Sequence, residues 1–472
     1  MKKACPFLFL ILTTLSFHLS VFADIRLPSV IGSNMVLQQQ SDCKLWGWCE
    51  PNEKIYITAS WNNRTDSAIG TRDAKWMVPI PTPAAGGPYT LTLKGRNTII
   101  LQNLMIGEVW ICSGQSNMEM SGPRRLPDIR DELAACATND IHFFRIPRTT
   151  AAWPQEGCSG EWTACDSNTL KSFSAAAYFF GRKLNQELHV PIGLIESAWG
   201  GTPAEVWTPA ALVNEDAALA ESAKRLEVTD GWPYTPGLCY NGMIAPVVPY
   251  NIKGAIWYQG ESNTIAPETY SRLFSTMIAS WRRAWNKELS FYYVQIAPFT
   301  YDRPGEGSLL REQQALTMKL LPGTGMVVIS DLVSDTTDIH PKDKHDVGLR
   351  LAGWALAETY HKDGIVYRSP SFKSMEVRGD KIAIQLENAP QGLIVKGPHV
   401  KTLFVAGADQ QFYPADAKWE NGHWIVRSPQ VKDPVAVRYQ FSNAGIGNVF
   451  GREGLPLAPF RTDDWALADL AK

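Results

Sequence analysis

The chain has no excess of positive charge, and its net charge is close to zero. Its 472 residues include 45 Lys and Arg against 47 Asp and Glu, a formal net charge of −2, and charged residues make up only 19%. A nucleic-acid partner is not expected, because binding phosphates requires concentrated Lys and Arg. Apolar residues make up 45% of the chain, which argues against extended disorder.

Zinc motifs and long apolar runs are also missing. The sequence contains no CxxC pair and no HExxH, so neither a structural nor a catalytic zinc ion is expected. Beyond the N-terminal segment, no stretch approaches the roughly 18 apolar residues that a membrane-spanning helix needs. The sequence therefore predicts no membrane span. There is no internal repeat and no low-complexity linker to suggest a repeat array.

The N-terminal 23 residues have the pattern of a secretory signal peptide. Lys2 and Lys3 form a positive start, Phe7 to Leu15 form a short apolar run, and Ala23 ends a small-residue cleavage site. The apolar run is too short for a membrane span. The pattern predicts an exported protein with a periplasmic or extracellular destination.

Removal of the signal peptide leaves an odd number of cysteines, so at least one must stay unpaired within the chain. The seven are Cys43, Cys49, Cys112, Cys136, Cys158, Cys165 and Cys239. Export permits disulfides. We expect the best candidate pairs to be Cys43 with Cys49 and Cys158 with Cys165, because each pair is close in sequence and turn-like. Cys112 lies in an apolar strand pattern and is expected to be a buried free thiol.

Hydropathy patterning divides the mature chain into three segments. Residues 24–105 show period-2 alternation broken by Gly, Pro and Asn, which favours a β-rich, sandwich-like domain. Residues 106–365 alternate strand and helix patterns, which predicts an α/β domain with a mostly parallel sheet and helices on both faces. Residues 366–472 return to the β pattern. Whether the two β-rich segments form one domain or two is left open by the sequence.

Within residues 106–365, apolar strands are expected at 108–112, 191–197, 254–258, 289–296 and 325–330. Helices are expected at 174–188, 270–285, 309–320 and 347–360. Sheets of this kind place their ligands beyond the carboxyl ends of the strands. Polar segments that directly follow a strand are therefore the candidate site.

Three polar segments meet that condition, namely 113–118, 259–263 and 335–341. A serine in the strand-to-helix turn of the first segment would be exposed at the sheet edge, although a serine there can also be a simple helix cap. In the second segment, the Asn263 amide can donate to an oxyanion, or it can form an Asx turn. Gln259 and Glu261 of that segment, together with Gln115 of the first, are candidate substrate contacts.

The third segment contains the histidine best placed to act as a base. His340 follows a strand and has Asp338 two positions earlier, where both side chains face the same side of an extended segment. A serine becomes nucleophilic only when a base lies within hydrogen-bond reach and is itself oriented by a third group. These residues together indicate nucleophilic catalysis by serine and histidine.

The motifs resemble the SGNH hydrolase superfamily and, within it, the sialate O-acetylesterase family. The resemblance covers nearly the whole mature chain, beginning with a similar entry sequence at Ile25. Its four motifs are Trp110-Ile-Cys-Ser-Gly-Gln-Ser-Asn-Met, Val190-Pro-Ile-Gly-Leu-Ile-Glu-Ser-Ala-Trp-Gly-Gly-Thr-Pro, Trp257-Tyr-Gln-Gly-Glu-Ser-Asn and Asp338-Ile-His-Pro. Their order makes the match specific, whereas any one alone would be weak. The resemblance implies an SGNH three-layer α/β sandwich.

The resemblance also implies roles for individual residues. Ser116 is expected to be the nucleophile and His340 its base, while the Ser116 N–H, a glycine N–H of Gly200 or Gly201, and the Asn263 amide form the oxyanion hole. Two motifs depart from the superfamily, with Gln115 where many members have Asp and a shortened Asp-x-His. Asp338 is our choice for the acid, with Asp335 and Glu261 as alternatives. The reaction needs no cofactor and no metal.

The expected reaction is removal of O-acetyl groups from sialic acids by a secreted serine esterase. An acetylxylan esterase or another polysaccharide deacetylase shares the same motifs and is the nearest alternative. A glycosidase using Glu119 with Glu261, or a non-catalytic carbohydrate-binding protein, would leave the serine and histidine unexplained. Trp199, Trp207, Trp232 and Trp257 lie near the motifs, where they form either core or a sugar-binding wall. The sequence leaves the oligomeric state open.

Overall fold

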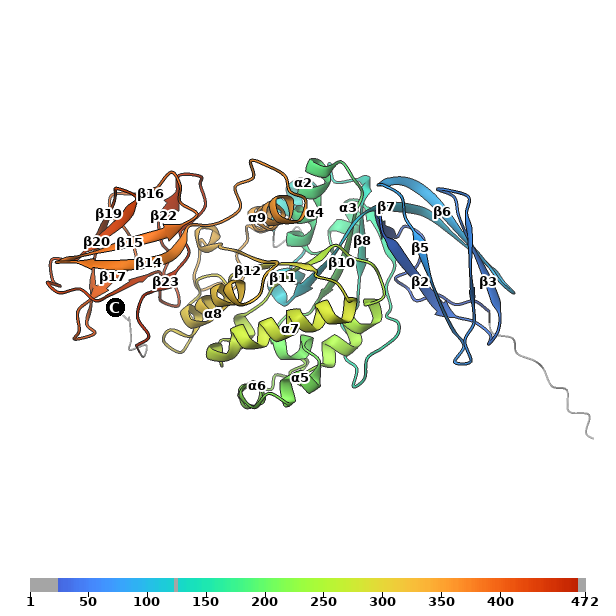
Figure 1. Ribbon diagram of the computed structural model, residues 1–472, viewed down its shortest axis with the longest axis horizontal. Coiled ribbons are helices and arrows are strands. Elements are labelled where there is room, and N and C mark those ends of the chain that lie inside the picture. The colour runs from blue at the N-terminus through green and yellow to red at the C-terminus, as the bar shows by residue number, and fades with distance from the viewer. Residues whose placement is uncertain (1–23, 123–125, 466–472) are drawn as a thin grey trace, which may run out of the picture.

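The computed structural model describes residues 24–122 and 126–465, so the expected signal peptide lies outside the described residues. Figure 1 shows an elongated molecule in which a β-rich part, an α/β part and a second β-rich part follow one another. The prediction of a mixed α/β fold with additional β-rich segments is confirmed. None of the described helices combines the length and apolar character that crossing a bilayer requires.

The N-terminal part consists of two small groups of strands. β2 pairs with β5, while β3, β4, β6 and β1 assemble around the start of β7. The bounds are β1 (Val36–Gln38), β2 (Asp42–Trp48), β3 (Lys54–Ala59), β4 (Thr65–Ile69), β5 (Lys75–Pro81), β6 (Gly86–Lys94) and β7 (Thr98–Gly114). Burial alternates along β3 and β5, as the period-2 pattern predicts.

β7 is one continuous strand of 17 residues that belongs to both parts of the molecule. Its first half pairs antiparallel with β6, and its second half pairs parallel with β10 and β11. The sequence pattern changes near residue 106, yet the strand does not break there. A single apolar core therefore runs from Ile57 of the N-terminal part to Trp281 under the central sheet.

The central sheet has the order β13-β12-β11-β7-β10-β8-β9, with every pair parallel except β8 with β9. Its remaining strands are β8 (Thr138–Arg145), β9 (Trp162–Cys165), β10 (Ile192–Ala198), β11 (Gly254–Tyr258), β12 (Ser290–Val294) and β13 (Thr324–Val327). The helices are α1 (Ser116–Glu119), α2 (Pro127–Glu132), α3 (Ser167–Leu170), α4 (Ala175–Leu188), α5 (Ala210–Asn214), α6 (Ala217–Ala223), α7 (Tyr270–Trp285), α8 (Glu306–Leu320) and α9 (Lys344–Trp354).

Helices cover both faces of this sheet. α4 and α9 pack together on one face, and α7 and α8 pack together on the other (Figure 1). Alternate residues of each strand enter different cores, so Trp110 packs on the α4 side and Ile111 on the α7 side. Strands buried on both faces have near-continuous apolar sequences, which explains why they could be recognised in the sequence.

β8 and β9 were not predicted from the sequence. The first half of β8 reads Thr-Asn-Asp, so its apolar run is too short to stand out. By contrast, the strands and long helices expected along the rest of this segment are present within a few residues. α4, for example, begins after Ser174, whose hydroxyl accepts the Ala177 N–H at 3.1 Å as a helix cap.

The C-terminal strands form their own small sheets around a separate core that includes Val405, Trp424 and Tyr439. No described strand of this part pairs with the N-terminal part. The bounds are β14 (Ser371–Arg378), β15 (Lys381–Glu387), β16 (Leu393–Val395), β17 (Leu403–Ala406), β18 (Phe412–Pro414), β19 (Asp416–Glu420), β20 (His423–Arg427), β21 (Ala436–Tyr439), β22 (Val449–Gly451) and β23 (Phe460–Arg461). Arg461 joins this part to α8 through a bidentate contact with Glu312 at 2.8 and 2.9 Å.

The expected disulfides are wrong. All seven cysteines from Cys43 onward are free thiols, and six of them are buried. Cys165 instead donates to the backbone carbonyl of Cys136 at 3.2 Å. Closeness in sequence did not place either expected pair in bonding geometry. The prediction that Cys112 is a buried free thiol is confirmed.

Candidate active site

The polar segments meet because their strands are neighbours in one parallel sheet. In the sheet register, Gly114 at the end of β7 lies opposite Ala198 of β10 and Tyr258 of β11. The segments that follow these three strands therefore leave the sheet at the same edge. The sequence-based prediction that the candidate segments assemble there holds for the first two, and the loop carrying His340 reaches them from beyond β13.

The turn that presents Ser116 depends on glycine at position 114. Gly114 has a φ of +139°, and a Cβ there would lie 2.2 Å from the Tyr258 carbonyl oxygen. Only glycine combines this backbone conformation with so close an approach. The next residue, Gln115, donates its backbone N–H to the same carbonyl at 3.0 Å, and α1 begins at Ser116.

Ser116, His340 and Asp338 lie in contact. The Ser116 Oγ is 2.9 Å from His340 Nε2, and His340 Nδ1 is 3.5 Å from Asp338 Oδ1. Asp338 also accepts the backbone N–H of His340 at 2.9 Å, which fixes the loop. When Nδ1 carries the ring proton, Nε2 is the acceptor for the serine hydroxyl. Asp335, the alternative acid, instead accepts hydrogen bonds from Thr337.

Burial and a neighbouring cation favour the neutral form of the histidine. Desolvation lowers the pKa of His340, and the positive charge of Lys344 lowers it further. The pKa of Asp338 is also lowered, chiefly by the hydrogen bond that it accepts from Lys342 at 2.6 Å. A neutral imidazole beside an ionised carboxylate is the arrangement that a general base requires.

Asn117 links the three segments behind the serine. Its Nδ2 donates to Glu261 Oε1 at 2.7 Å and to the Ile339 carbonyl at 3.0 Å, next to His340. Its Oδ1 accepts from Lys344 Nζ at 2.7 Å. Burial raises the pKa of Glu261 and lowers the pKa of Lys344 to about 7. The buried network thus fixes the histidine loop relative to the serine turn.

The side chains of Asn263 and Gln259 are buried and already hydrogen-bonded. Asn263 Nδ2 donates to the buried Glu205 at 2.8 Å, and its Oδ1 accepts from Gln259 Nε2 at 2.7 Å and from the Ala204 N–H at 2.9 Å. Neither side chain lines the cavity over Ser116. These hydrogen bonds hold the loops after β10 and β11 together, and Tyr270 also donates to Gln259 Oε1 at 2.9 Å.

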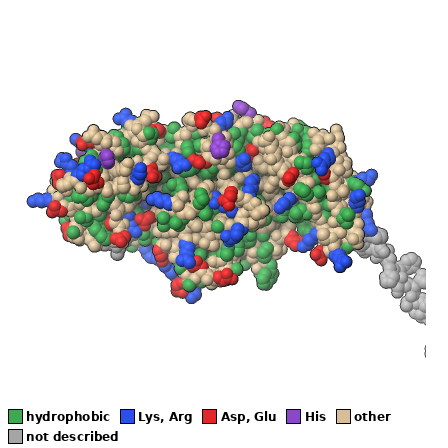
Figure 2. Space-filling model, viewed as in Figure 1, with side chains coloured by type: hydrophobic (Ala, Val, Ile, Leu, Met, Phe, Trp, Pro, Cys, Tyr) green, Lys and Arg blue, Asp and Glu red, His purple; other side chains and the backbone are tan. Residues whose placement is uncertain are grey.

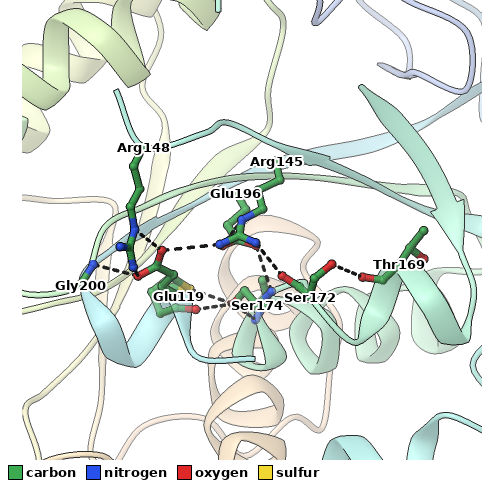
Figure 3. A network of polar contacts seen from close by, with 10 residues as sticks. Glu119, Arg145, Arg148, Thr169, Ser172, Ser174, Glu196 and Gly200 are labelled. Carbon is green, nitrogen blue, oxygen red and sulfur yellow. Dashed lines mark hydrogen bonds and ion pairs between the residues drawn. The ribbon is translucent and has the colours of Figure 1, made fainter. Parts of the chain in front are cut away.

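A carboxylate lies beside the serine and accepts the Gly200 N–H. Glu119 Oε2 receives that N–H at 2.9 Å, and Arg148 binds both oxygens of Glu119 at 2.7 and 2.6 Å (Figure 3). Arg145 lies between Glu119 and the buried Glu196, at 3.6 and 3.4 Å. Burial raises the pKa of Glu196 to about 7.

A cavity of about 630 Å³ opens over Ser116 and His340. Gln115 is 4% exposed and forms part of its wall. The Gln115 Oε1 accepts the N–H groups of Gly260 and Ser262 at 3.4 and 3.3 Å. The side-chain NH₂ makes no hydrogen bond to another described residue.

Sequence reasoning missed Asn117, Glu205, Lys344 and the arginines of the cavity. Asn117 lies within the first motif, so its position was a usable signal. Arg145 is the last residue of β8 and Arg148 follows it, and this strand was not predicted. No sequence pattern indicated a role for Lys344 or Glu205, because their hydrogen-bond partners, Asn117 and Asn263, are distant in the sequence. Of the four tryptophans considered, Trp207 and Trp257 are fully buried core residues, whereas Trp232 lines the cavity.

Comparisons with known proteins place this chain among carbohydrate esterases. Residues 106–361 match the family described as "Carbohydrate esterase, sialic acid-specific acetylesterase". The chain is 27% identical over 398 residues to the sialate O-acetylesterase of Homo sapiens, covering 76% of each chain. It is 26% identical over 415 residues to the sialate O-acetylesterase of Rattus norvegicus, covering 75% of this chain and 77% of the relative.

A solved structure is similar over almost the whole chain. The carbohydrate acetylesterase from Xanthomonas citri is 35% identical, with a TM-score of 0.86. The superposition covers 94% of this chain and 100% of the other. The similarity therefore includes the flanking β-rich parts as well as the central sheet.

Proposed function

The chain belongs to the sialic acid-specific acetylesterase family of carbohydrate esterases and is a carboxylic ester hydrolase, and we propose that it removes O-acetyl groups from sialic acids. The observation that carries the proposal is the 2.9 Å contact between Ser116 Oγ and His340 Nε2 at a cavity, within a chain similar to sialate O-acetylesterases. An acetylated polysaccharide is the second candidate, since the 35% identical structure is named only as a carbohydrate acetylesterase.

The proposed reaction proceeds through an acetyl-enzyme. His340 Nε2 takes the Ser116 proton while Oγ attacks the acetyl carbonyl, and Asp338 stabilises the imidazolium that forms. His340 then gives the proton to the departing sugar oxygen as the ester bond breaks. In the second half, His340 removes a proton from water, which attacks the acetyl-enzyme and releases acetate and Ser116.

The proposed oxyanion donors are the Ser116 N–H, the Gly200-Gly201 backbone and the free NH₂ of Gln115. The Gly200 N–H donates to Glu119 in this structure, and Arg148 also binds that carboxylate. An oxyanion would have to displace the Glu119 carboxylate to accept the Gly200 N–H. The Asn263 amide, which was the sequence-based candidate, already donates to Glu205. Each oxyanion donor typically contributes about 2.7–4 kcal/mol to the transition state.

A glycosidase using Glu119 and Glu261 has no support in the geometry. Glu119 is paired with Arg148, and Glu261 is 6% exposed and bound by Asn117. We retain as proposals the SGNH type of the fold, a signal peptide over residues 1–23, and export. The division into residues 24–105, 106–365 and 366–472 is likewise a proposal.

The test is acetate release from O-acetylated sialic acid and acetylated xylan by three forms of the protein. We expect the wild type to favour the sialic acid and Ser116→Ala to lose activity on both. Gln115→Glu keeps the oxygen that binds Gly260 and replaces the NH₂, so kcat should fall about 10²-fold. Full activity of Ser116→Ala would overturn the mechanism, and a preference for xylan would favour the second candidate.

A further inference from the structure

A second cavity of about 540 Å³ adjoins the one over Ser116. The two share five wall residues, namely Gly201, Trp232, Glu261, Ser262 and Ile339. Ser116 and His340 belong only to the first. Each cavity lies within the range of about 300–1,000 Å³ that small-molecule sites occupy. An acetylated single sugar would need only the first cavity, so the second requires another explanation.

Exposed aromatic rings line the second cavity. Trp232 is 48% exposed and Tyr234 is 39% exposed, which is unusual for large apolar side chains beside a reactive serine. The Trp232 ring packs on Gly201, where a Cβ would lie 2.3 Å from the ring. Aromatic faces next to polar groups suit a ligand whose rings have apolar C–H faces and hydroxyl edges.

Unsatisfied polar atoms lie in the same wall. Glu261 Oε2 and the Tyr301 hydroxyl are buried and lack a hydrogen-bond partner within residues 24–122 and 126–465. Both residues line the second cavity. Both atoms are enclosed by protein rather than open to the cavity, so the exposed aromatic rings, and not these atoms, are the groups that a ligand can contact. Arg303, in contrast, is already paired with Glu306 at 2.8 Å.

Residues 299–303, which line the second cavity together with the aromatic rings, are held in place by the C-terminal part of the molecule. The backbone carbonyl of Asn443 accepts the N–H of Phe299 at 3.0 Å. Its side-chain Nδ2 donates to the carbonyls of Tyr301 and Arg303 at 3.2 and 2.8 Å. A preformed wall reduces the ordering cost of binding.

We propose that the second cavity binds a further sugar residue, joined to the acetylated sugar whose ester lies at Ser116. The enzyme then recognises an acetylated glycan chain rather than a free acetylated monosaccharide. Trp232 and Tyr234 contact the ring of the second sugar. This inference rests on the proposed deacetylase function and specifies the class of substrate.

The test uses two matched pairs of substrates. O-acetylated sialyllactose is compared with free O-acetylated sialic acid, and acetylated xylotriose with acetylated xylose. In whichever pair is hydrolysed, we expect kcat/KM to be about tenfold higher for the chain, equivalent to about 1.4 kcal/mol. Trp232→Ala and Tyr234→Ala should reduce that ratio to nearly 1. Trp153→Ala, at a 78% exposed tryptophan outside both cavities, should leave the ratio unchanged.

The outcomes separate the two proposals. A ratio near 1 in the wild type, or a ratio that Tyr234→Ala leaves intact, overturns the glycan-chain inference while the deacetylase function stands. If none of the four esters releases acetate, the proposed function itself fails. Circular dichroism of each variant verifies folding, and Tyr234→Phe separates loss of the ring from loss of the hydroxyl.

Discussion

At the scale of single residues, the site combines one exposed reactive contact with a buried network that positions it. Ser116, His340 and Glu261 line the cavity, whereas Asn117 and Lys344 lie behind them. The charges of Glu261 and Lys344 act on Ser116 and His340 through a protein interior that screens them poorly. Two substitutions test these roles separately.

Asp338→Asn tests the acid of the triad. Asp338 is 3.5 Å from His340 Nδ1, while Asp335 contacts Thr337. We expect Asp338→Asn to lower kcat at least tenfold, since the ionised carboxylate stabilises the imidazolium. Asp335→Asn is the matched control and should change kcat less than twofold. Equal losses in the two variants, measured by acetate release, would remove Asp338 from the triad.

Lys344→Met tests the charge that lowers the His340 pKa. The base is active when neutral, so the acid limb of kcat/KM against pH should lie below the usual value of about 6.5. Removing the Lys344 cation raises the His340 pKa, and the limb should move to higher pH. Lys373→Met, at an exposed lysine, is the control. An unchanged or lower midpoint in Lys344→Met would contradict this account.

At the scale of elements, the site depends on how closely β7 passes β11. The register places Gly114 against Tyr258, and α1 starts two residues later. The reactive serine is thus positioned by a strand that the N-terminal part also uses. A substitution that displaces β7 would therefore affect both the sheet and the turn that carries Ser116.

Gly114→Ala should disrupt both stability and activity. The new Cβ would meet the Tyr258 carbonyl at 2.2 Å, at a φ of +139°. We expect the free energy of unfolding to fall by more than about 2 kcal/mol, with activity largely lost. Gly364→Ala is the control, because Gly364 has a φ of +75° and no atom within 4 Å of the added Cβ. Its cost should be about 1 kcal/mol, and urea unfolding of both variants measures the difference.

At the scale of the whole molecule, a shared apolar core and polar contacts join the three parts. None of the cysteines in the described residues forms a disulfide. The N-terminal part shares its core with the central sheet, and the C-terminal part docks through Arg461 and Asn443. Figure 2 shows positive and negative side chains interspersed over the visible face, without a region of one sign. The C-terminal contacts reach the loop beside the second cavity, so this part contributes to the site indirectly.

Thiol titration tests the absence of disulfides. A chain beginning at residue 24, unfolded in denaturant without reductant, should titrate seven thiols. The folded protein should react far more slowly, because burial raises the pKa values of Cys112 and Cys239 and disfavours their thiolates. A reductant should leave the melting temperature unchanged. Five or fewer thiols in the unfolded, unreduced chain would show a disulfide.

The sequence by itself determined the alternation of strands and helices, the candidate motifs and the family. Those features are local: a strand buried on both faces must be apolar, and a polar segment after it marks the sheet edge. β8 was missed because half of it is polar, and Arg145 and Arg148 were missed with it.

Only the tertiary structure decided which polar groups meet. Glu205 takes the amide of Asn263, Glu119 takes the N–H of Gly200, and Gln115 keeps a free NH₂. Together with the contacts of Gln115 Oε1, these contacts join residues up to 147 positions apart, and each side chain has several possible partners until packing selects one. The same holds for the cysteines, because the spacing suggested two pairs and the fold leaves all four thiols free.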